Sequence, residues 1–130
     1  MDVTPLVKSG YQIIQNYGPS GFKVSGQIYE HPVLVFIDRT VEWATSNTPD
    51  NLQADDLQQI YDNADNIDVV LLGCGEQMEF VSPALRQQLQ KAGVSIEPMD
   101  TGAACRTFNV LMAEERRVVA ALFPPKAQSY

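Results

Sequence analysis

One stretch near the end of the chain, Pro98–Arg117, gathers more chemically distinct side chains than any other segment. It contains an acid and a hydroxyl (Asp100, Thr101), a thiol (Cys105), a guanidinium (Arg106) and an amide (Asn109). Asp100 or Thr101 is expected to cap a helix over residues 102–115, and the unpartnered N–H groups at such a helix start attract anions. Arg106 and Asn109 lie three residues apart and share a helix face. Together these groups can hold a carboxylate, a phosphate or the backbone of a partner.

A structural interpretation of the same residues stays open. Asp100 or Thr101 then serves only as the N-cap, as these residue types often do. The small residues 102–104 allow the helix to approach a sheet closely. Arg106 pairs with Asp100 or with a carboxylate elsewhere in the chain.

Cys105 is the candidate nucleophile, because a helix start and the adjacent Arg106 both lower the pKa of a thiol. A nucleophile also needs a positioned base. The one histidine, His31, is expected in a loop that nothing in the sequence places near Cys105. An apolar helical stripe comprises Ala104, Cys105, Phe108 and Met112. We therefore expect a buried structural cysteine, and we assign no catalytic residue.

Gly73-Cys74-Gly75 ends a predicted strand, and open α/β sheets bind ligands at the carboxyl ends of their strands. The glycines match neither GxGxxG nor GxxxxGK(S/T), and a tight turn with positive φ is the alternative interpretation. The helix at Asp100 also follows a strand of the expected sheet, so both segments should meet at one edge. The residues predicted to bind a ligand or partner there are Gly73, Gly75, Asp100, Thr101, Arg106 and Asn109.

The apolar pattern predicts the elements that position this edge. Strands buried on both faces are expected at 33–37, 68–73 and 118–123, with a short alternating strand at 94–97. Helices are expected at 52–64, capped by Asp50 or Asn51, and at 83–92, besides 102–115. A turn at 18–21 within residues 12–29 indicates an N-terminal meander or hairpin. The alternation of strands and helices predicts an α/β domain with a largely parallel sheet covered by helices.

Length and composition set the class of protein. The 130 residues, 45% of them apolar, fit one domain over 1–130, with an ordered core at about 11–124 and a flexible tail at 125–130. The formal net charge of −7 disfavours nucleic acid and anionic membranes as partners. The exposed-aromatic candidates are Tyr17, Phe22 and Trp43, which can anchor an interface, although burial in the core is the expectation.

Cysteine and histidine usage excludes several site types. Two cysteines far apart do not make a disulfide scaffold, and one histidine cannot build a His-rich zinc site. No metal or cofactor is therefore expected. The start MDVTPLVKSG lacks the pattern of a signal peptide, and no apolar run approaches the ~20 residues of a membrane helix. These features favour a cytoplasmic location.

Four stretches together resemble the MTH938-like family of small domains of unknown function. They are YGPSGFKVSGQIY, VVLLGCG, DTGAACRTFNVL and ERRVVAALFP, and the resemblance runs from about Tyr11 to Pro124. The family has GtG where this chain has Gly73-Cys74-Gly75. The resemblance implies a three-layer α/β domain with a mixed central sheet, flanking helices and an additional N-terminal β-hairpin portion.

The resemblance also bears on function, because one mitochondrial relative is an assembly factor for respiratory complex I and the family has no established catalytic residues. Our leading hypothesis is a non-enzymatic binding or assembly module that recognises another protein at the edge formed by Gly73–Gly75 and the Asp100–Asn109 helix start. The alternative is an enzyme or a binder of a small anionic ligand held there by Arg106.

Overall fold

The computed structural model describes residues 8–126; the expected flexibility at 127–130 lies outside this range. A five-stranded central sheet contains β4 (Val33–Val35), β5 (Thr40–Glu42), β6 (Val69–Cys74), β7 (Ser95–Met99) and β8 (Val118–Phe123), in the order β5-β4-β8-β6-β7. β6 runs parallel to β7 and β8, whereas β4 is antiparallel to β8 and β5. The mixed sheet implied by the family resemblance is thus confirmed, and the largely parallel sheet predicted from the alternation was wrong for the half that contains β4 and β5.

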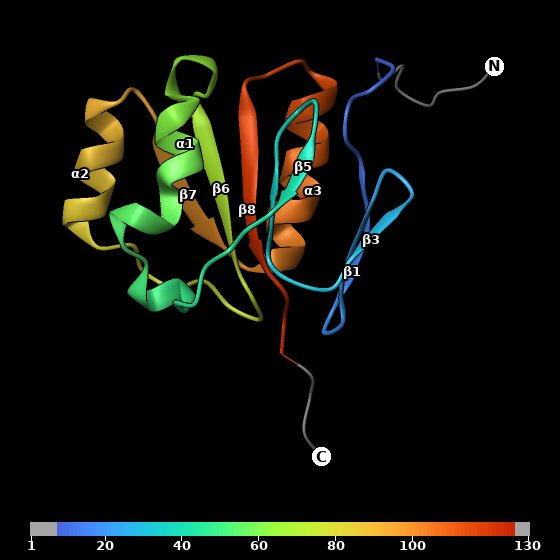
Figure 1. Ribbon diagram of the computed structural model, residues 1–130, viewed down its shortest axis with the longest axis horizontal. Helices are drawn as coiled ribbons and strands as arrows, with labels where there is room; N and C mark the ends of the chain where they lie inside the picture. Colours follow the sequence, from blue (N-terminus) through green and yellow to red (C-terminus); the bar gives the residue numbers. More distant parts are fainter. Residues whose placement is uncertain (1–7, 127–130) are drawn as a thin grey trace.

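Helices cover both faces of this sheet (Figure 1). α1 (Gln58–Asp62) and α2 (Pro83–Lys91) lie on one face. α3 (Thr101–Ala113) packs on the other face, beside a three-stranded antiparallel sheet of β1 (Ile14–Gly18), β2 (Gly21–Val24) and β3 (Gln27–Tyr29). The predicted three-layer α/β class and the N-terminal meander are confirmed.

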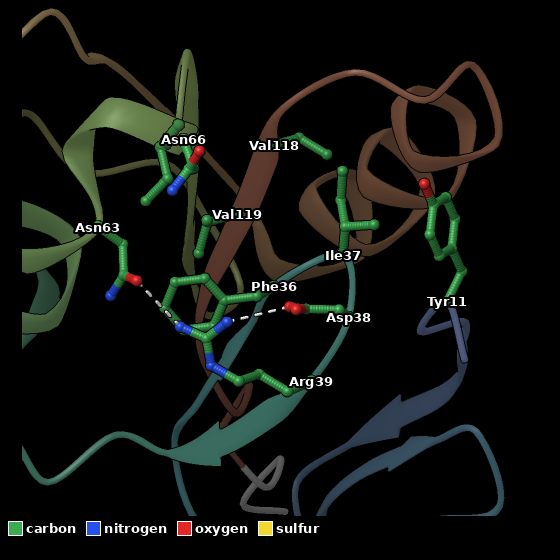
Figure 2. A pocket seen from close by; sticks show the side chains of 10 residues that line it. Tyr11, Phe36, Ile37, Asp38, Arg39, Asn63, Asn66, Val118 and Val119 are labelled. Atoms are coloured by element: carbon green, nitrogen blue, oxygen red, sulfur yellow. Dashed lines mark hydrogen bonds and ion pairs between the residues drawn. The ribbon is translucent and has the colours of Figure 1, made fainter.

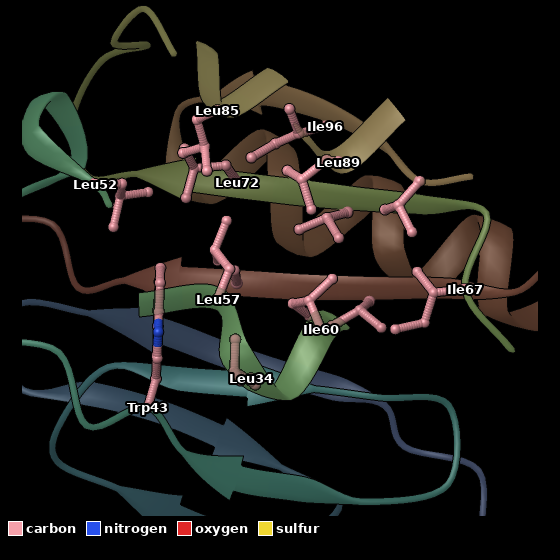
Figure 3. Close-up of a cluster of buried hydrophobic side chains, with 14 of the residues drawn as sticks. Leu34, Trp43, Leu52, Leu57, Ile60, Ile67, Leu72, Leu85, Leu89 and Ile96 are labelled. Atoms are coloured by element: carbon pink, nitrogen blue, oxygen red, sulfur yellow. The ribbon is translucent and has the colours of Figure 1, made fainter. Parts of the chain in front are cut away.

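Apolar strands alternate between two cores. Val119, Ala121 and Phe123 of β8 join the core beneath α1 and α2, while Val118, Ala120 and Leu122 join the core beneath α3. Successive side chains of a strand point to opposite faces, so a strand buried on both sides needs an unbroken apolar run. Figure 3 shows the first core, which contains Leu57 and Ile60 together with Leu85 and Leu89 of α2.

The predicted helix at 52–64 was wrong in its extent. The segment forms a 3-10 helix at Ala54–Leu57, the short α1, and a second 3-10 helix at Ala64–Asn66. Gln53, rather than Asp50 or Asn51, stands at the start of the first 3-10 helix. The Asp56 carboxylate accepts hydrogen bonds from Thr45 Oγ1 and Asn47 Nδ2, both at 2.7 Å, which tie this turn to the preceding loop.

The predicted strand at 33–37 was also too long. Phe36 N donates to Arg39 O at 2.8 Å, which turns the chain into β5. The sequence pattern did not predict β5, whose three residues carry too short an alternation to be recognised.

Candidate functional site

Thr101 joins the two segments that the sequence placed at one sheet edge. Its Oγ1 accepts a hydrogen bond from Gly75 N at 2.8 Å and donates one to Phe123 O at 2.6 Å. Its backbone N donates to Gly75 O at 2.8 Å. The start of α3 is therefore fastened to the carboxyl ends of β6 and β8. Thr101 is fully buried, so it stabilises the edge and is not exposed on its surface.

Gly73 and Gly75 are needed for two different reasons. A Cβ on Gly73 would lie 2.8 Å from Leu122 Cδ2 and 3.2 Å from Thr101 Cα, so Gly73 lets the helix start approach β6. Gly75 has φ +93°, a conformation that side chains rarely adopt. Both glycines lie at the predicted edge, where Gly73 permits the close approach of α3 and Gly75 permits the turn after β6.

Asp100 already occupies the start of α3. Its Oδ1 accepts a hydrogen bond from Ala103 N at 2.9 Å, as the predicted N-cap should. A carboxylate at this position supplies the negative charge that the helix dipole favours. Asp100 therefore already supplies the negative charge that an external anion would bring to this helix start.

Arg106 and Asn109 have separate partners on β1. The Asn109 side chain donates to Ile14 O at 2.8 Å and accepts from Ile14 N at 2.9 Å, so it anchors β1 to α3. Arg106 is exposed, and its Nη1 donates to Tyr17 Oη at 3.4 Å. The structural interpretation expected Arg106 to pair with a carboxylate; among the described residues it forms no ion pair.

Cys105 lies in the α3 core, as its apolar stripe predicted. Its side chain is 3% exposed and packs with the cluster that contains Phe108 and Met112. Burial raises the pKa of the Cys105 thiol to about 12, although the nearby Arg106 charge opposes this effect. The thiol is therefore protonated and inaccessible at neutral pH.

We expect Cys105 to react with thiol reagents at neutral pH only after unfolding. Because the folded pKa lies above the ordinary value of 9.0, the folded protein keeps the proton while the unfolded chain loses it. The contribution of Cys105 to stability is therefore complete below pH 9.0 and is lost as the pH rises towards 12, at up to about 1.4 kcal/mol per pH unit. Urea unfolding of wild type and Cys105→Ala across this range should show the stability difference shrinking with pH, whereas a constant difference would contradict the buried thiol.

A groove of about 290 Å³ opens at the carboxyl ends of β6 and β8. Its lining residues are Asn47, Thr48, Pro49, Cys74, Gly75, Glu76, Gln77, Glu79, Phe123, Pro124 and Lys126. Two carboxylates and one ammonium group give this lining a net negative charge, which disfavours an anionic ligand in the groove. Of the six residues predicted from sequence, Gly75 alone lines it.

The loop that follows β6 carries two exposed apolar side chains beside this groove. Phe80 is 83% exposed and Met78 is 46% exposed. They flank Glu79 in the chain, and Glu79 lines the groove. Neither Met78 nor Phe80 was predicted from the sequence.

A second cavity, of about 370 Å³, lies at the opposite end of the sheet. Figure 2 shows the Arg39 guanidinium over the Phe36 ring, 4.0 Å from its centroid, with hydrogen bonds to Asp38 at 3.0 Å and Asn63 at 3.3 Å. These contacts hold the β4–β5 turn against the end of α1. Arg39 therefore has a structural role in joining the β4–β5 turn to the end of α1.

The other chemically distinct side chains have structural partners. Trp43 is buried and donates from Nε1 to Asp56 O at 2.7 Å, and Phe22 is buried in the α3 core, as expected. Tyr17, by contrast, is 39% exposed. Arg117 binds the Asp68 carboxylate at 2.6 Å, and this bond lowers the pKa of Asp68. Within residues 8–126, no group of three or more His, Cys, Asp or Glu side chains is placed to hold a metal ion.

A family model described as a protein of unknown function (DUF498/DUF598) matches residues 14–123. The chain belongs to this family. Its resemblance to the MTH938-like domains is confirmed by the solution structure of a Bordetella pertussis protein described as an Mth938-like domain, which has a TM-score of 0.82 and 27% identity. That similarity covers 98% of this chain and 95% of the other.

Two further relatives carry other descriptions. A crystal structure described as an outer membrane protein from Bartonella henselae has a TM-score of 0.82 and 32% identity, over 90% of this chain and 98% of that one. NADH dehydrogenase (ubiquinone) 1 alpha subcomplex assembly factor 3 from Danio rerio is 33% identical over 90% of this chain and 67% of its own length. The chain spans only 60% of the human protein of that name. Across residues 8–126, no helix combines the length and apolar character that crossing a bilayer requires.

Proposed function

We propose that this protein is a binding module that assists the assembly of a multi-subunit protein complex. The family relatives named as assembly factors of NADH dehydrogenase support this class of function. By their name, subunits of a respiratory NADH dehydrogenase are the class of partner to test first. A cytoplasmic location stays a prediction from the sequence.

The observation that carries the proposal is the exposure of Phe80 beside the groove at the carboxyl ends of β6 and β8. Among the large apolar side chains of residues 8–126, Phe80 is the most exposed. Burial of an exposed aromatic side chain by a partner stabilises the complex, and aromatic residues often contribute most of the binding energy of an interface. We call the groove lining together with Met78 and Phe80 the carboxyl-edge surface.

The residues predicted from sequence have two roles in this proposal. Gly73 and Thr101 maintain the edge through the close approach and the hydrogen bonds described above, and Asn109 anchors β1 to α3. We further propose that Gly75, Asp100 and Arg106 contact a partner that covers the edge and the start of α3.

Affinity capture from native extract, with mild crosslinking, tests the proposal. Wild type should recover a stoichiometric protein partner, and Phe80→Ser should recover at most about a tenth as much, the loss expected when a hot-spot aromatic is removed. Ile28→Ser is the matched control, because Ile28 is 69% exposed but lies on β3. Failure of wild type to recover any partner, or equal recovery by Phe80→Ser, would contradict the proposal.

A further inference from the structure

The groove of the carboxyl-edge surface combines apolar walls with an acidic rim. Phe123 is almost fully buried, and Pro49 and Pro124 are half-buried, so these residues form apolar walls. Glu76 is exposed and Glu79 is half-buried at the same groove. Such a lining suits a side chain that is apolar along its length and positively charged at its end.

The carboxylates of Glu76 and Glu79 are available to a ligand. Neither forms an ion pair with another described residue. Lys126 is the one cation among the lining residues, and it leaves one negative charge in excess. The formal net charge of −7 adds a long-range attraction for a basic partner.

The size of the groove limits its occupant. At about 290 Å³ it lies just below the range for small-molecule pockets, roughly 300–1,000 Å³. It has room for a long side chain with its flanking backbone. Exposed Met78 and Phe80 beside it offer a second, apolar contact to the neighbouring residues of the same segment.

We propose that the carboxyl-edge surface binds a basic, apolar peptide segment of a protein partner. An arginine or lysine side chain enters the groove, its stem lies against Phe123 and Pro124, and its charged end meets Glu76 and Glu79. A leucine-like neighbour covers Phe80. This inference rests on the proposed function and names the chemistry of the partner. The acidic rim would repel an anionic bilayer, which favours a protein as the occupant.

A peptide probe tests this chemistry directly. The probe is a short, capped peptide of alternating leucine and arginine, and its matched control carries citrulline, which has the shape of arginine without the charge. In fluorescence anisotropy the arginine peptide should bind wild type at least about tenfold more tightly than the citrulline peptide. This ratio corresponds to about 1.4 kcal/mol, which a charge-assisted hydrogen bond can supply. Equal binding of the two peptides would overturn the proposal.

Matched variants separate the groove from the general charge of the chain. Glu76→Gln/Glu79→Gln should weaken arginine-peptide binding by about tenfold. Glu30→Gln/Glu97→Gln removes the same charge from exposed positions elsewhere and should weaken it by less than about twofold. Equal losses in the two variants would mean non-specific attraction and would overturn the proposal.

Three other outcomes are also decisive. If wild type sediments as a dimer and Phe80→Ser as a monomer, a second copy occupies the surface and the basic-segment proposal is wrong. If partner capture depends on Phe80 but not on Glu76 and Glu79, the proposed function stands while this inference falls. If wild type captures no protein partner from extract but still binds the arginine peptide selectively, the proposed assembly function alone is contradicted.

Discussion

Thr101→Val is expected to lower the free energy of unfolding by about 3 kcal/mol, because it leaves a buried N–H and a buried carbonyl without their hydrogen-bond partner, at about 1–3 kcal/mol each. The hydroxyl of Thr101 accepts from Gly75 N and donates to Phe123 O in a fully buried position. Valine keeps the shape and the β-branching of threonine, so the loss is chiefly one of hydrogen bonding. Urea denaturation measures it through the transition midpoint.

Thr107→Val is the matched control for this measurement. Thr107 lies in the same helix, is half-buried, and makes no side-chain hydrogen bond to another described residue. We expect the free energy of unfolding of Thr107→Val to stay within about 0.5 kcal/mol of the wild-type value. A Thr101→Val protein as stable as Thr107→Val would show that the Thr101 hydroxyl does not fasten the edge.

Gly73→Ala is expected to destabilise the protein by about 2 kcal/mol, within the range of about 1–3 kcal/mol for overpacking a dense interior. The added methyl group would lie 2.8 Å from Leu122 Cδ2 and 3.2 Å from the backbone of Thr101. Leu122 is itself fully buried and has little room to move. The strand and the helix start must therefore separate, which should also loosen the groove at Gly75.

Gly18→Ala provides the control for this substitution. Gly18 also belongs to a strand, its φ is not positive, and a Cβ there would meet nothing within 4 Å. In thermal unfolding, the melting temperature of Gly18→Ala should be close to that of wild type, and the melting temperature of Gly73→Ala should be clearly lower. Similar melting temperatures for the two variants would contradict the close approach of α3 to β6.

Much of the fold could be predicted because local rules and tertiary packing agree. The unbroken apolar run of β8 predicts a strand buried on both faces, and the structure places its residues in both cores. The presence of Asp100 predicts a helix start, and in the structure its side chain caps α3 by accepting a hydrogen bond from Ala103 N. The stripe through Cys105 predicts burial because the helical period alone decides which face meets the sheet.

The roles of the predicted site residues needed the tertiary structure. Helical spacing places Arg106 and Asn109 on one face, but it does not reveal that β1 supplies the partners of both. Asn109 binds the backbone of Ile14, a contact that no side-chain pattern encodes. Phe80 escaped prediction for a similar reason, since nothing in a turn sequence tells whether its apolar residue points inward.

Photo-crosslinking from position 80 tests the central claim most directly, namely that the carboxyl-edge surface binds a protein partner. A photoreactive phenylalanine at position 80 replaces an exposed aromatic by a similar one, and position 28 on β3, which is 69% exposed, provides the control. Illumination in the native host should give one discrete protein adduct from position 80 and none from position 28. An absence of adducts from position 80, or the same adducts from both positions, would contradict the claim.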